Sequence, residues 1–139
     1  MGIINYDNAK YSLAMIEFKN YISTVLSIDG KLEDADFIFN RIIYRQNKTE
    51  DEIEVLRKFA FTEYAKISQY LKKVKKDIIK YQTELKDFLD ENPEKQTDFN
   101  AVLDHLIPLV EEQEKNINFK VLKCFECFKE SSVTESLWH

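Results

Sequence analysis

Glycine and proline are scarce in this sequence. Only two of each occur among 139 residues, whereas an all-β protein needs many turn residues. The scarcity of these turn residues favours a few long helices. No apolar run approaches the length that spans a membrane, and two cysteines cannot form a disulfide framework. The N-terminus has no basic segment or signal-like core, so we expect a cytoplasmic protein without a membrane partner.

Arginine is scarce as well, and the net charge is −5. A protein that binds nucleic acid usually carries a basic surface. Lysine, which supplies nearly all the cations here, is a poor substitute for arginine in bidentate recognition of bases or phosphates. The composition therefore disfavours nucleic acid as a partner.

The first part of the chain predicts two shorter helices, over residues 7–28 and 33–46. Asp7 can cap the first helix, and Gly30 is expected to end it as the residue just past its C-terminus. Acidic residues then fill the first turn of the second helix, where the helix dipole favours them. The segment 29–36 is thus expected to be a corner between two helices.

Residues 50–91 predict one unusually long helix. Thr49 and Glu52 have the spacing of a capping box, and no Gly or Pro follows until Pro93. The apolar residues recur at steps that alternate between four and three: Ala60, Tyr64, Ile67, Leu71, Val74, Ile78, Tyr81, Leu85 and Phe88. This spacing is typical of a coiled-coil seam.

Another long helix is predicted over residues 98–130, after a turn at Asn92-Pro93. Pro108 should kink it, and residues 131–139 are expected to form a tail. Its seam has the same spacing: Phe99, Leu103, Leu106, Val110, Gln113, Ile117, Val121, Cys124 and Phe128. Folding back at Asn92-Pro93 pairs seam residues whose numbers sum to 187 or 188. The same register places Lys72–Lys76 near Glu111, Glu112 and Glu114.

These patterns predict an all-α fold in a single domain over residues 1–139. A long antiparallel, coiled-coil-like hairpin carries the two N-terminal helices, which gives an arrangement like a four-helix bundle. The hairpin is longer than two short helices can cover, at 1.5 Å of rise per residue. Part of its seam is therefore expected to remain exposed, as a surface for a partner or a second copy.

Candidate chemistry is sparse. Asp29, Glu33, Asp34 and Asp36 surround Gly30, but Val25 stands where the first ligand of an EF-hand loop would have to be. Cys124 and Cys127 lack the preceding strand and the further ligands of redox or zinc sites, so we interpret them as buried structural cysteines. His105 lacks a motif and is expected at the surface. Catalytic, cofactor-binding and metal-ligating residues are not predicted.

The hypothesis that fits best is a non-enzymatic protein-binding module. By analogy of size and charge, it would be an inhibitor- or immunity-type protein that occludes a partner with a basic surface. The partner-binding candidates are Asp29, Glu33, Asp34, Asp36, Leu137 and Trp138. The alternative is a homodimeric scaffold or assembly chaperone. A weaker alternative is a metal-binding helical protein that uses the loop from Asp29 to Asp36.

Overall fold

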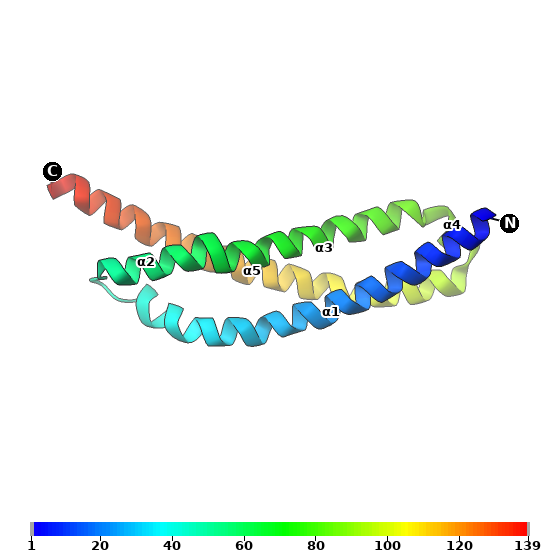
Figure 1. Cartoon of the computed structure of the whole chain (residues 1–139), viewed down its shortest axis with the longest axis horizontal. Coiled ribbons are helices and arrows are strands. Elements are labelled where there is room, and N and C mark those ends of the chain that lie inside the picture. Colours follow the sequence, from blue (N-terminus) through cyan, green and yellow to red (C-terminus); the bar gives the residue numbers. More distant parts are fainter. Residues whose placement is uncertain (1, 139) are drawn as a thin grey trace. The chain divides into compact units, whose positions relative to one another are not determined.

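The computed structural model describes the backbone of residues 2–138 and the side chains of residues 6–129. Within this range every regular element is a helix (Figure 1). The elements are α1 (Gly2–Ile43), α2 (Glu50–Lys58), the π-helical turn η1 (Phe59–Glu63), α3 (Tyr64–Glu84), α4 (Lys86–Glu91) and α5 (Pro93–Trp138). The prediction of an all-α, bundle-like fold with a long helix packed against others is confirmed.

Helix α1 runs from Gly2 to Ile43 without a break, so the two N-terminal helices predicted over 7–28 and 33–46 are wrong. Gly30 has no positive φ and lies inside the helix. The reason is tertiary: Val25, Ile28 and Leu32 are buried at helical spacing on both sides of Gly30. This continuous apolar face outweighs a glycine that costs about 1 kcal/mol relative to alanine.

The predicted helix over residues 50–91 is present, with two irregularities. The capping box forms: the Glu52 N–H donates to Thr49 Oγ1 at 3.1 Å, and the Thr49 N–H donates to Glu52 Oε1 at 3.0 Å. In η1 the Tyr64 N–H donates to the Phe59 carbonyl, which widens the turn by one residue. A one-residue interruption at Leu85 separates α3 from α4.

Helix α5 begins at Pro93 and ends at Trp138, so both predicted boundaries, 98 and 130, are wrong. Proline is favoured in the first helical turn, where its missing N–H is not needed. The Asn92 carbonyl accepts from the Gln96 N–H at 3.0 Å, which starts the helix. Pro108 lies within α5, and the helix continues through it. Residues 131–138 are helical rather than a tail; the side chains of Leu137 and Trp138 lie outside the described residues.

The predicted single domain divides into two compact units. Unit 1 comprises Met1–Ser27 and Leu71–Gln113, and unit 2 comprises Ile28–Tyr70 and Glu114–His139. The divisions fall within α1, α5 and the stretch of α3 before Leu71. Each unit therefore contains a segment of α1 packed with segments of the long hairpin.

In unit 1, α1 lies antiparallel to α3. Glu17 Oε2 accepts from the Tyr81 hydroxyl at 2.6 Å, and the Tyr21 hydroxyl donates to Asp77. The Phe18 ring packs edge-on against Tyr81 at 5.6 Å between centroids. The same ring lies 5.5 Å from Phe99 of α5. The Tyr11 hydroxyl also donates to the Lys95 carbonyl of α5 at 3.3 Å. The α1 segment is thus held to both helices by aromatic contacts and by hydrogen bonds.

In unit 2, aromatic rings fill the core. Phe39 of α1 contacts Phe59 at 6.4 Å and Tyr64 at 5.9 Å between centroids. Phe59 stacks on Tyr64 at 5.5 Å, five residues away, which the widened turn of η1 permits. Burial, and then nearby Asp36 and Cys124, raise the pKa of Tyr64. The proximity of Tyr64 and Cys124 agrees with the predicted register of the hairpin.

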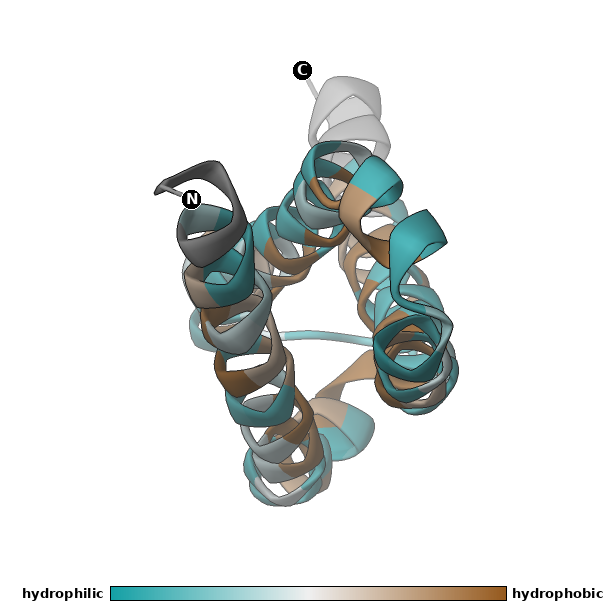
Figure 2. Ribbon diagram, turned by 90° about the vertical axis from the view of Figure 1, so that its right-hand side faces the viewer, coloured by the Kyte–Doolittle hydropathy of each residue, from teal (hydrophilic) through white to brown (hydrophobic). Residues whose placement is uncertain are grey.

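The expectation of an exposed seam is wrong, because the uninterrupted α1 supplies the missing cover. The hydrophobic positions recur as brown bands along each helix, with teal positions between them (Figure 2). Nearly all described seam positions are buried: Ala60, Tyr64, Leu71, Val74, Ile78, Tyr81, Leu85, Phe88, Phe99, Leu103, Leu106, Val110, Gln113, Ile117 and Cys124. The predicted seam is therefore not available as a surface for a partner.

The substitution Gly30→Ala should raise the free energy of unfolding by about 1 kcal/mol, because a methyl group there meets no other atom within 4 Å. Urea unfolding at low protein concentration measures this change. Asn40→Gly, on an exposed position of the same helix, should instead lower stability by a few tenths of a kcal/mol. A loss of stability in Gly30→Ala would mean that Gly30 has a positive φ and ends the helix.

Candidate functional site

The predicted acidic residues do not act as one cluster. Because α1 is continuous, Asp29, Glu33 and Asp36 follow one another at spacings of four and three and share one face of the helix. Together with Leu32 they line a pocket. Asp34 is exposed and does not line this pocket. The structure thus brings three of the four predicted carboxylates together.

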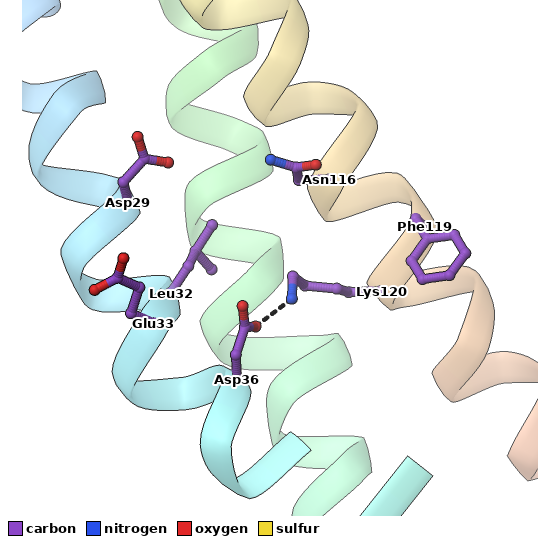
Figure 3. A pocket seen from close by; sticks show the side chains of 7 residues that line it. All are labelled: Asp29, Leu32, Glu33, Asp36, Asn116, Phe119 and Lys120. Carbon is purple, nitrogen blue, oxygen red and sulfur yellow. Dashed lines mark hydrogen bonds and ion pairs between the residues drawn. The ribbon is translucent and has the colours of Figure 1, made fainter. Parts of the chain in front are cut away.

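The opposite wall of the pocket comes from α5. Asn116, Phe119 and Lys120 line it. Asn116 and Lys120 project toward α1, whereas the Phe119 ring lies over the α5 ribbon (Figure 3). The pocket has a volume of about 350 Å³ and is open to solvent. All its lining residues belong to unit 2. We call these seven residues the acidic pocket.

Lys120 determines the electrostatics of the acidic pocket. Its ammonium forms an ion pair with Asp36 and lies 5.2 Å from the centre of the Phe39 ring. Both charges are largely shielded from solvent, which strengthens their attraction relative to an exposed pair. Lys120 neutralises Asp36, and the exposed Glu33 forms no ion pair among the described residues, so Glu33 gives the pocket a negative charge that suits a cationic side chain.

A metal site is not assembled from the predicted residues. Among residues 6–129, no group of three His, Cys, Asp or Glu side chains has the geometry to hold a metal ion. Asp36, the carboxylate deepest between the helices, is already neutralised by Lys120.

The second feature of unit 2 is an exposed apolar surface, formed by residues outside the predicted seams. Phe61 is 61% exposed, Phe119 53% and Leu122 56%, and Phe125 is also exposed. The Phe61 ring lies 5.5 Å from Phe125 between centroids. We call these four residues the aromatic face. Phe119 belongs to both the aromatic face and the acidic pocket, so the two features adjoin.

Local structure explains why the aromatic face is exposed. Phe59 and Ala60 are buried in the first half of η1, and the widened turn directs Phe61 outward. On α5, Phe119, Leu122 and Phe125 recur every three residues along the side away from buried Ile117 and Cys124. The heptad pattern contains no signal for the π-helical turn, but the three-residue recurrence off the seam is visible in the sequence.

The thiols and the histidine occupy the positions that sequence analysis predicts. Cys124 and Cys127 are buried and unbonded to each other. Burial, with a smaller contribution from Cys127, raises the pKa of the Cys124 thiol to about 12, which keeps it in its unreactive protonated form. His105 is exposed on α5.

The predicted pairing of the lysine run with acidic residues of α5 is only partly observed. Lys75 and Glu111 line one groove of unit 1, together with Ile78 and Val110. Lys72, Lys73 and Lys76 are exposed and form no ion pair within the part of the chain that the structure describes. The lysine run is therefore a largely solvated face of α3.

Comparisons with protein-family models, with curated proteins and with solved structures find no match to this chain. Within the described residues, no helix has the length and hydrophobicity that crossing a membrane requires.

The Asp36–Lys120 ion pair should contribute about 1 kcal/mol to stability, more than the median exposed pair, because both groups are partly desolvated. A double-mutant cycle of Asp36→Asn and Lys120→Met, measured by urea unfolding, isolates this coupling. The exposed pair Glu54–Arg57 is the matched control and should give a few tenths of a kcal/mol. Additive effects of Asp36→Asn and Lys120→Met would contradict the pairing.

Two buried tyrosines should respond differently to removal of the hydroxyl group. The Tyr64 hydroxyl is buried without a hydrogen-bond partner among the described residues, so Tyr64→Phe should leave stability unchanged or raise it. The Tyr81 hydroxyl donates to Glu17, so Tyr81→Phe should lower stability by about 1 kcal/mol. Urea unfolding of both variants measures the contrast, and the opposite order would refute this hydrogen-bond assignment.

Proposed function

We propose that this chain is a non-enzymatic module that binds another protein through the aromatic face and the adjoining acidic pocket of unit 2. Occlusion of a functional surface of that partner, as an inhibitor or immunity protein does, is the mode of action we favour. The observation that carries the proposal is the exposure of Phe61, Phe119, Leu122 and Phe125 on a unit whose core is already filled by other rings.

The energetics of the aromatic face support binding. Burial of one Phe or Leu side chain contributes roughly 1.5–3 kcal/mol, and contiguous exposed apolar patches commonly mark interaction sites. Phe61 is fixed by contacts with Phe125 and with Phe128, at 6.1 Å between centroids. A pre-packed aromatic anchor loses little conformational freedom when a partner binds.

The acidic pocket indicates the chemistry of the partner. Lys120 neutralises Asp36, whereas Glu33 is exposed without an ion pair among the described residues. A partner that covers Phe119 with an apolar side chain could therefore place a Lys or Arg beside Glu33. This agrees with the expectation of a basic partner surface. Leu137 and Trp138 stay predicted contacts.

The placement of reactive groups supports a non-enzymatic role. Both thiols are buried, and the pKa of Cys124 is raised, largely by burial. Lys120 is held in an ion pair with Asp36. These buried or paired groups are compatible with the non-enzymatic role proposed here.

The experiment uses the immobilised chain to capture partners from a lysate of the source organism, followed by binding measurements with each purified candidate. Leu122→Asp, at the centre of the aromatic face, should weaken binding of the true partner at least about tenfold. Ile79→Asp is the matched control, because Ile79 is equally exposed but lies on α3 in unit 1. Equal affinity of the wild type and both variants would contradict the proposed surface.

The mode of action needs its own measurement. If the chain occludes a functional surface, its addition should reduce the partner's activity in proportion to the complex formed. Glu33→Lys should slow association with a basic partner. It should also make the association rate less dependent on salt concentration. Binding that leaves every activity of the partner intact would favour a scaffold or chaperone instead.

A further inference from the structure

A second exposed stripe runs along the outer side of α1 in unit 2. Gly30, Asp34, Phe37 and Arg41 of α1 follow one another at steps of four, three and four, and Tyr44, in the turn just after the helix, adds a step of three. This is the spacing of a helix-pairing seam. All five are exposed, Phe37 at 69% and Tyr44 at 73%. The opposite side of the same segment, with Leu32 and Phe39, is buried in the core.

Gly30 has no role within the chain that alanine could not fill. It lies inside α1 without a positive φ, and a Cβ there would meet nothing within 4 Å. A glycine at such a position weakens the helix. What glycine does provide is a flat site where a large side chain of another molecule can approach the backbone closely.

The stripe is complementary to itself when two copies run antiparallel. In that arrangement facing residues have numbers that sum to 74 or 75. Phe37 then meets Phe37 of the second copy at the two-fold axis, Asp34 meets Arg41, and Gly30 meets Tyr44. Opposite charges face each other and the smallest residue faces a large ring, as an isologous interface requires. A parallel pairing would set Asp34 against Asp34 and Arg41 against Arg41.

The unpaired state of the charges fits this arrangement. Neither Asp34 nor Arg41 forms an ion pair within the described residues. The Arg41 guanidinium instead lies 5.9 Å from the centre of the Phe37 ring, along the stripe and away from the core. Both charges are thus available for a partner stripe.

We propose that this stripe of α1 pairs antiparallel with the same stripe of a second copy of the chain. We favour a second copy over a different protein because a single stripe already contains both partners of each contact: Asp34 with Arg41, and Gly30 with Tyr44. The contact spans about four helical turns, so it lies at the small end of the size range of specific interfaces, which begins at about 1,200 Å². The dimer should therefore dissociate on dilution. This proposal uses a different surface from the aromatic face and does not rest on the proposed function.

The test is sedimentation velocity on the full chain between about 5 and 500 µM. The wild type should show a reversible monomer–dimer equilibrium. Arg41→Asp and Asp34→Arg should each weaken the dimer at least about tenfold, because like charges then face each other. The double variant Asp34→Arg/Arg41→Asp should restore the dimer. Lys73→Asp, an exposed charge reversal of equal size in unit 1, should have no effect.

Three outcomes would overturn the proposal: a wild type that stays monomeric at the highest concentration, single variants that dimerise like the wild type, or a double variant that fails to recover. Circular dichroism verifies that each variant keeps its helix content. As an independent readout, Phe37→Cys should form a disulfide-linked dimer on mild oxidation, because the two thiols meet at the axis. Ile79→Cys should not, and equal cross-linking of both would also overturn the proposal.

Discussion

Helix α1 passes through Gly30 without ending, and the rest of the structure depends on that continuity. The hairpin of α2–α4 with α5 has an apolar seam along its length, and each unit needs a third helical segment to cover it. Residues up to Ser27 provide it in unit 1 and residues from Ile28 in unit 2. The same continuity aligns Asp29, Glu33 and Asp36 on one face and leaves a separate stripe on the outside.

Features encoded by long, regular spacing could be predicted from the sequence. The heptad seams identify the hairpin. Apolar residues that recur every three or four positions share one face of a helix, and that face is buried when it packs against another helix. Proximity of Tyr64 and Cys124 agrees with the register obtained by folding at Asn92-Pro93. The capping box at Thr49 is local chemistry and forms as its residues predict. Buried cysteines follow from their seam positions.

Features decided by competition between local and distant interactions could not be predicted as securely. A glycine followed by acidic residues is a good local signal for a helix end, yet the buried spacing of Val25, Ile28 and Leu32 continues through it. The apolar spacing that continues past Gly30 was the feature of the sequence that indicated an uninterrupted helix. The Asp36–Lys120 pair joins segments far apart in the chain, and their mutual register is set by packing. Within the aromatic face, the exposure of Phe61 depends on the π-helical turn, whose hydrogen bonding leaves no simple pattern in the sequence.

The most direct test of this account is amide hydrogen exchange with assigned NMR resonances across Ile28–Asp34. In a continuous α1, the amides of Lys31 to Asp34 donate to carbonyls four residues earlier and should be protected, with helical Cα chemical shifts throughout. If a helix ended at Gly30 and another began after it, those amides would belong to a first turn without partners. Rapid exchange there, with a positive φ at Gly30, would contradict the account.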